Sequence, residues 1–155
     1  MSITLAEADA IIAAIFKRGR ELKLRPLSVV VVEPGAIVKA FRKEDGSAMM
    51  RFEMAFGKAY ASLALGRSSD LVRQRAEHRP MFMDYLLGAS RGQIFPEGGG
   101  QLIRNARGDV IGAVGVTGDT QEQDHELASH GIHAAGLKTD DDCSGLGAQV
   151  RVTRD

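Results

Sequence analysis

The sequence predicts an α+β domain in which helices cover both faces of a mainly antiparallel sheet. This prediction rests on the order of the expected elements, which is helix, hairpin, helices, hairpin, helix. It also rests on size, since 155 residues with 44% hydrophobic and 26% charged side chains suit one ordinary domain with its own core. The single cysteine, Cys143, excludes an internal disulfide framework and a zinc site built from several thiolates.

The first helix and the first hairpin have clear local signals. Thr4 and Glu7 have the spacing of a capping box, and apolar residues follow at helical intervals. Pro26 ends this region, because proline cannot continue a helical hydrogen-bond pattern. A β-branched run at 27–32, a Pro-Gly turn and a second run at 36–41 then predict a hairpin.

The middle of the chain is predicted to be helical. Residues 48–65 are apolar on nearly every side, which predicts a largely buried helix. Shorter helices are expected from Ser68 to about Glu77 and from Pro80 to about Gly88.

A second hairpin and a last helix follow. Strands are expected at 99–104 and 110–117, and glycines in the second strand indicate the close approach of backbone or ligand. Asp119 and Glu122 have the spacing of a capping pair that opens the last helix.

Charge and hydropathy exclude several classes of function. The 20 basic and 20 acidic residues cancel, so we expect no nucleic-acid partner. No apolar stretch reaches the ~18 residues that span a bilayer, and the amino-terminal residues lack the basic flank of a signal peptide. We therefore expect a cytoplasmic protein with no membrane partner. Motifs of hydrolases, Walker loops and dinucleotide-binding folds are absent from the sequence.

Two cations share one side of the buried middle helix. Arg51, Lys58 and Ser62 fall within a narrow stripe, opposite a stripe of aromatic and aliphatic residues. Such a stripe suits a carboxylate ligand, and a desolvated lysine could also serve as a base. The alternative is that both side chains reach water or pair with acids such as Glu33.

The last helix carries a carboxylate and two histidines of interest. Asp124 lies on the inward face, where its charge must be paired or hydrogen-bonded. It could serve the local structure or act in catalysis. Glu126, His130 and His133 share an arc that could seat a metal, but the arc points away from the apolar face. We favour a solvated face or a subunit interface there and predict no metal site.

A glycine-rich stretch is the most specific motif of the chain. It comprises Gly98, Gly99 and Gly100, then residues 108–118, then Gln123-Asp124 on a helix. Glycine lets backbone amides approach a ligand closely, and such amides can collect an anion. A bulge or tight turn is the alternative explanation.

This stretch resembles the GlcG/HbpS family, which includes haem-binding HbpS-like proteins and the C-terminal domain of PduO-type proteins. In that family a Gly-Gly-Gly-x-Pro-Ile loop precedes Gly-x-x-x-Gly-Ala-x-Gly-Val-Ser-Gly and a Glu/Gln-x-Asp on a helix. The resemblance covers residues 3–137. The chain departs from the pattern at Leu102, Glu33 and Thr117, where the family usually has proline, aspartate and serine.

The resemblance implies a fold and a domain organisation. The fold is a profilin-like three-layer α/β/α sandwich with a five-stranded, mainly antiparallel sheet, usually assembled into a homo-oligomer. Residues 1–137 would form a single GlcG/HbpS-like domain. Residues 138–155 would form a polar, loosely held tail, in which 149–152 could add an edge strand.

The resemblance also implies a ligand, which is haem or a related tetrapyrrole, or else a small anionic molecule. The pocket would be built from Arg51, Lys58 and the glycine loop Gly98–Gly100. His125 and His78 could approach a haem iron, but the resemblance singles out no axial ligand. The alternative is a catabolic enzyme that acts on a carboxylated metabolite in the same pocket, with Lys58 or Asp124 as catalytic acid or base.

Overall fold

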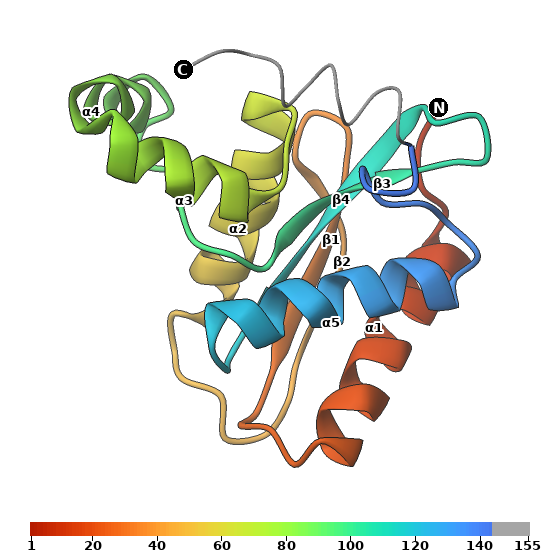
Figure 1. Cartoon of the computed structure of the whole chain (residues 1–155). Coiled ribbons are helices and arrows are strands. Elements are labelled where there is room, and N and C mark those ends of the chain that lie inside the picture. The colour runs from red at the N-terminus through yellow and green to blue at the C-terminus, as the bar shows by residue number, and fades with distance from the viewer. Residues whose placement is uncertain (144–155) are drawn as a thin grey trace.

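The computed structural model describes residues 1–143, and the predicted edge strand at 149–152 lies outside the described residues. Five helices and four strands occur in the described part (Figure 1). In chain order they are α1 (Leu5–Glu21), β1 (Ser28–Glu33), β2 (Ile37–Lys43), α2 (Arg51–Leu65), α3 (Ser69–His78), α4 (Pro80–Ala89), β3 (Gly100–Arg104), β4 (Val110–Thr117) and α5 (Gln121–Ala134).

The sheet has the order β2-β1-β4-β3, and every neighbouring pair is antiparallel. Both predicted hairpins are therefore confirmed. The expected five-stranded sheet is wrong for the described residues, because the sheet has four strands. After α5 the chain returns to the edge of β3, where residues 135–143 make one isolated bridge, between Arg104 and Lys138. The next residue, Thr139, begins a turn, in which its backbone N–H donates to Asp142 Oδ2 at 2.8 Å.

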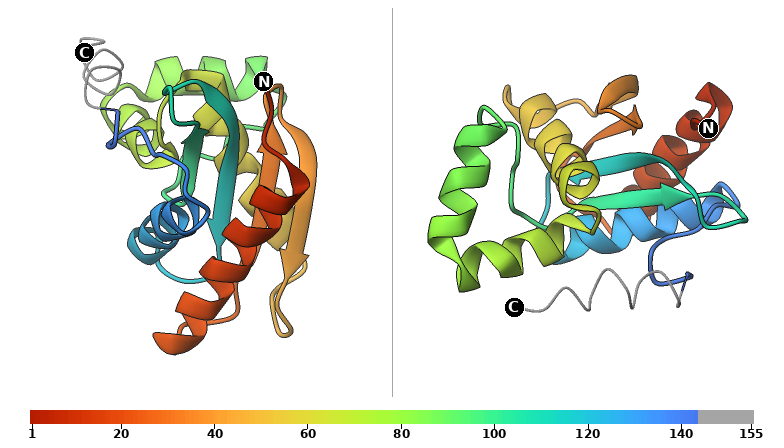
Figure 2. Two further views of the ribbon diagram at one scale, coloured as in Figure 1. Left: turned by 90° about the vertical axis from the view of Figure 1, so that its right-hand side faces the viewer. Right: turned by 90° about the horizontal axis from the view of Figure 1, so that it is seen from above.

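The sheet is covered on both faces, as predicted. Helices α1 and α5 lie together over one face, and α2 lies over the other (Figures 1 and 2). Helices α3 and α4 extend outward beyond α2 (Figure 2). Strand β1 runs through the middle, so its valines alternate between the two cores: Val29 and Val31 face α1 and α5, and Val30 and Val32 face α2.

Helix α2 packs directly on β4 because β4 contains glycine. A Cβ atom at Gly115 would lie 1.9 Å from the carbonyl oxygen of Ala55 in α2. No side chain fits in that space, so the predicted close approach at this position is one of backbone to backbone. This contact brings the cationic side of α2 beside the end of β4 and the start of α5.

The helix starts follow local chemistry. The capping box of Thr4 and Glu7 is present at α1. The expected capping pair at α5 is wrong, because Thr120 is the N-cap and accepts a hydrogen bond from the Gln123 amide. Asp119 instead accepts from the backbone amides of Arg25 and Thr120.

The first residues of the predicted loose tail are anchored. Arg104 binds Asp140 at 2.7 Å, and Lys138 pairs with the edge of β3. Within residues 1–143, none of the helices combines the length and the apolar character that crossing a bilayer requires.

Candidate functional site

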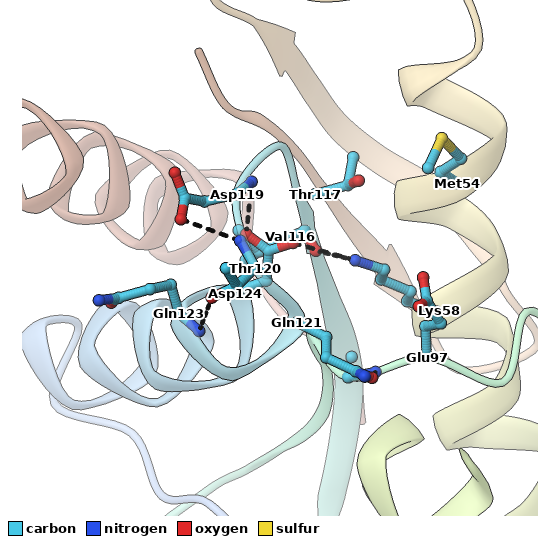
Figure 3. Close-up of polar contacts among 12 residues, drawn as sticks. Met54, Lys58, Glu97, Val116, Thr117, Asp119, Thr120, Gln121, Gln123 and Asp124 are labelled. Carbon is cyan, nitrogen blue, oxygen red and sulfur yellow. Dashed lines mark hydrogen bonds and ion pairs between the residues drawn. The ribbon is translucent and has the colours of Figure 1, made fainter. Parts of the chain in front are cut away.

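The centre of the candidate site is a buried ion pair between α2 and α5. Lys58 is 2% exposed, and its Nζ donates to Asp124 Oδ2 at 3.1 Å and to the Val116 carbonyl oxygen at 2.9 Å. Figure 3 shows the Lys58 side chain crossing from α2 to the end of β4 and the start of α5. An ammonium has three N–H donors, and these two bonds use two of them.

Asp124 ties this pair to the loop before α5. Its Oδ1 accepts from the Asp119 amide at 3.1 Å, while Oδ2 accepts from Lys58. The predicted inward position of Asp124 is confirmed, because it is 1% exposed. The alternative that Lys58 pairs with an acid is confirmed, but the acid is Asp124 and not Glu33, which contacts Ser2 and Lys39.

Burial pushes both groups of the pair toward their neutral forms. Desolvation is the largest effect on each: it lowers the pKa of Lys58 and raises the pKa of Asp124, and the attraction between the two opposes both shifts. The charge of Glu97 also acts on Lys58 and supports its protonated form. Perturbed pairs of this kind occur at functional sites and in structural networks alike.

Arg51 lies two helical turns before Lys58 in a different environment. Its side chain is only partly buried, and its Nη1 donates to Thr117 Oγ1 at 2.9 Å, with a weaker contact to Met54 Sδ at 3.8 Å. Both contacts are to uncharged groups. Within the part of the chain that the structure describes, Arg51 has no carboxylate within ion-pair distance.

The glycine loop packs against the buried pair. A Cβ atom at Gly99 would lie 2.3 Å from the Val116 carbonyl oxygen, and one at Gly100 would lie 2.2 Å from the Lys58 carbonyl oxygen. Close packing of the chain on itself therefore already requires glycine at both positions. Two of the loop amides also have partners, since Gly98 donates to Gln121 Oε1 at 3.1 Å and Gly100 to Ser69 Oγ at 2.7 Å.

The structure brings together all the predicted site residues, namely Arg51, Lys58, Gly98, Gly99, Gly100 and Asp124, around one end of β4. Sequence reasoning missed their polar neighbours Glu97, Thr117 and Gln121 (Figure 3). The position of Glu97 directly before the glycine run was a usable signal. Nothing in the spacing of Thr117 or Gln121 indicates their neighbours, because those contacts arise from packing.

The histidines lie elsewhere. His130 and Glu126 line a cavity of about 400 Å³ between α1 and α5. His133 contacts Asp142 at 2.7 Å. His125 has a buried Nδ1 with no hydrogen-bond partner within residues 1–143, and His78 is exposed. No group of three His, Cys, Asp or Glu side chains among the described residues could hold a metal ion.

The fold and the site define a class: an α+β domain whose glycine loop packs on a buried lysine–aspartate pair. The chain belongs to the HbpS-like family, since the model of that family, described as haem degrading protein HbpS-like, matches residues 3–133. The resemblance seen in the sequence is thereby confirmed.

Individual relatives agree with this placement. An uncharacterised 15.0 kDa protein of the dhaT-dhaS intergenic region of Citrobacter freundii is 28% identical over 127 residues, which cover 82% of this chain and 87% of that protein. The structure of a PduOC–heme complex superposes with a TM-score of 0.80 at 21% identity, covering 90% of this chain and 99% of the other. Klebsiella pneumoniae protein ORFY has a TM-score of 0.77 at 27% identity, covering 86% and 90%.

Proposed function

We propose that the protein binds haem, a related tetrapyrrole or another small anionic ligand beside α2, with Arg51 as the group that meets a ligand carboxylate. The observation that carries the proposal is the partly buried Arg51, whose guanidinium donates to neutral acceptors alone among residues 1–143. Haem fits the family description and the bound ligand of one structural neighbour.

The residues present suit the carboxylate end of such a ligand. A guanidinium carries five N–H donors in a planar fork that matches a carboxylate, and a charge-assisted bond is stronger than one to a hydroxyl. Exchanging the Thr117 hydroxyl for a propionate would therefore strengthen the bonding of Arg51. Met54 and Phe95 supply apolar surface next to the cations, with the Phe95 ring 5.9 Å from Lys58 Nζ.

Lys58 and the glycine loop have a supporting part in this proposal. Asp124 already neutralises the Lys58 ammonium, so Lys58 offers its remaining N–H rather than a net charge. Gly98, Gly99 and Gly100 form the wall beside it, held by Gln121 and Ser69. Haem, when bound, would supply the iron chemistry; this chain's residues would bind and orient its carboxylates.

A haemin titration followed at the Soret band tests the proposal. Arg51→Ala should weaken binding roughly 10-fold or more, since bonds to charged groups contribute about 1.5–3 kcal/mol. Arg42→Ala is the matched control, because Arg42 is an exposed arginine paired with Val29, whose side chain faces the opposite core. A flat titration of the unsubstituted protein would refute haem binding, and equal effects of the two variants would refute the role of Arg51.

We also propose that the protein is a homo-oligomer in the cytoplasm. Helix α4 supports self-association, because its apolar residues Met81 and Tyr85 are 85% and 73% exposed. Light scattering after size-exclusion chromatography gives the subunit number. A monomer at micromolar concentration would contradict the proposed homo-oligomer.

A second candidate function is acid–base catalysis on a carboxylated metabolite. The shifts of Lys58 and Asp124 toward neutrality favour it, because buried groups with perturbed pKa values can move a proton near neutral pH. In this case Lys58→Met should abolish turnover of a carboxylated substrate, while Arg51→Ala should mainly raise its KM. Turnover that survives both Lys58→Met and the double change Lys58→Met, Asp124→Leu would exclude this candidate.

A further inference from the structure

Ser28, the first residue of β1, has a hydroxyl that forms no hydrogen bond with the other described residues. The residue is fully buried, and its Oγ has no hydrogen-bond partner among residues 1–143. A buried hydroxyl without a partner destabilises the folded state, so most such groups in proteins are satisfied by protein atoms or by bound molecules. The orphan atom therefore indicates a missing oxygen or nitrogen next to Ser28.

The sheet register places Ser28 beside the Arg51 contact. Ser28 pairs with Thr117 across β1 and β4, and such cross-strand partners have Cβ atoms about 4.5–5.5 Å apart on the same face. That face is the one under α2, because Val30, two residues along β1, packs in the cluster that contains Ala55. Thr117 is the residue whose Oγ1 accepts from Arg51.

The neighbouring polar groups do not supply the missing partner. Just before Ser28, the Leu27 amide donates to Glu44 Oε1 at 2.9 Å, and the Leu27 carbonyl accepts from Ser47 Oγ at 3.4 Å. The other Glu44 oxygen lies 3.6 Å from Arg20. Ser28, Thr117 and Arg51 all carry hydrogen-bond donors, and among residues 1–143 Arg51 forms no ion pair with a carboxylate.

We propose that Ser28, Thr117 and Arg51 together bind one carboxylate of the ligand. The carboxylate would replace Thr117 Oγ1 as the acceptor for Arg51. It would also accept a hydrogen bond from the Thr117 hydroxyl and one from the Ser28 hydroxyl, which would give Ser28 the partner it lacks. This inference rests on the proposed function, because it names the atoms that receive the anionic end of that ligand. The two hydroxyls and the guanidinium distinguish a carboxylate from its neutral ester, which would lose the charge-assisted bonds.

Two probes and one variant test the inference. Haemin and haemin dimethyl ester share the iron and the macrocycle but differ in the charge of the carboxyl groups. Ser28→Ala should weaken haemin binding by roughly 10-fold, the range of a hydrogen bond to a charged group, and should leave binding of the ester unchanged. The unfolding midpoint of Ser28→Ala should stay the same or rise, since the variant removes an unsatisfied hydroxyl.

Ser129→Ala is the control, because Ser129 is a partly buried serine of α5 that contacts Gln101 away from the proposed carboxylate site. It should bind both probes like the unsubstituted protein. If Ser28→Ala binds haemin as tightly as the unsubstituted protein, Ser28 holds only an internal water and the inference is overturned while haem binding stands. If Ser28→Ala weakens haemin and ester equally, the carboxylate assignment is overturned. If the unsubstituted protein binds no haemin, the proposed function fails together with the inference.

Discussion

Lys58 and Arg51 lie on the same side of α2, yet they differ in burial and in the partners that they contact. Lys58 is sealed between α2, β4 and α5, with a carboxylate and a carbonyl oxygen as partners. Arg51 is the first residue of the same helix, is only partly buried, and contacts a hydroxyl and a thioether. A stripe of two cations thus contains one residue with a buried carboxylate partner and one that contacts a hydroxyl and a thioether, which is the residue that we propose meets the ligand.

The difference arises from what faces each residue. The carboxylate opposite Lys58 comes from Asp124, 66 residues further along the chain, while Arg51 meets the uncharged end of β4. A buried charge without a partner is costly, so the deeper cation needs an internal carboxylate and the shallower one does not. The predictions below test this contrast, starting from the largest effect.

Loss of Asp124 should have the largest effect. Asp124→Ala leaves the buried Lys58 ammonium without its partner, so the free energy of unfolding should fall by about 3–5 kcal/mol. Urea unfolding measures this change. Glu122→Ala, an exposed position of the same helical turn, is the control and should change stability by about 0.5 kcal/mol or less. If Asp124→Ala had only a small effect, the burial of Lys58 would not depend on its ion pair with Asp124.

The glycine loop should be nearly as sensitive. Gly100→Ala places a Cβ atom 2.2 Å from the Lys58 carbonyl oxygen, and overpacking of this kind costs about 1–3 kcal/mol. Gly88→Ala in α4 is the matched control, because no atom beyond its chain neighbours and the nearby backbone of its own helix lies within 4 Å of its added Cβ. That change should be neutral or stabilising, since alanine is the better helix former. Thermal unfolding of the two variants compares them directly.

The pair should also give stability a particular pH dependence. Burial holds the pKa of Asp124 above 3.8, so just above pH 3.8 the folded state retains a proton that the unfolded state loses, and stability falls as pH rises. Burial holds the pKa of Lys58 below 10.5, so just below pH 10.5 the unfolded state binds the extra proton, and stability rises with pH.

Comparison with a double variant isolates this contribution. Lys58→Met combined with Asp124→Leu removes both titrating groups. The free energy of unfolding of the unsubstituted protein minus that of the double variant should therefore pass through a minimum between these two pH ranges. Urea midpoints measured across the pH range give the curve. A difference that does not vary with pH would show that the pair is not shifted by burial.

Removal of Arg51 should have the smallest effect on stability. Arg51→Ala loses one hydrogen bond to a hydroxyl at a partly exposed position, so the free energy of unfolding should change by about 1 kcal/mol or less. Urea unfolding of this variant beside Asp124→Ala measures the contrast between the two cations. Comparable losses in both variants would make Arg51 a structural residue as well.

Much of the fold follows from local sequence signals. The capping box at Thr4 and Glu7 and the two runs that pair as hairpins depend on neighbouring residues, and the structure confirms them. The start of α5 was placed wrongly because Asp119 and Thr120 both suit an N-cap, and the contact of Asp119 with Arg25 decides between them. The number of strands was wrong for residues 1–143 because it was taken from the resemblance, whereas pairing at a sheet edge depends on how the returning chain packs.

By itself the sequence determined that Arg51 and Lys58 share one side of a buried helix and that Asp124 faces inward on another. Helical periodicity alone is enough for such statements, since it relates residues within one element. Only the tertiary structure decided that Asp124 meets Lys58, that Thr117 meets Arg51 and that the Ser28 hydroxyl has no partner within residues 1–143. These relations join elements far apart in the chain, and they depend on how closely the backbones approach, which here is set by the glycines of β4 and of the 98–100 loop.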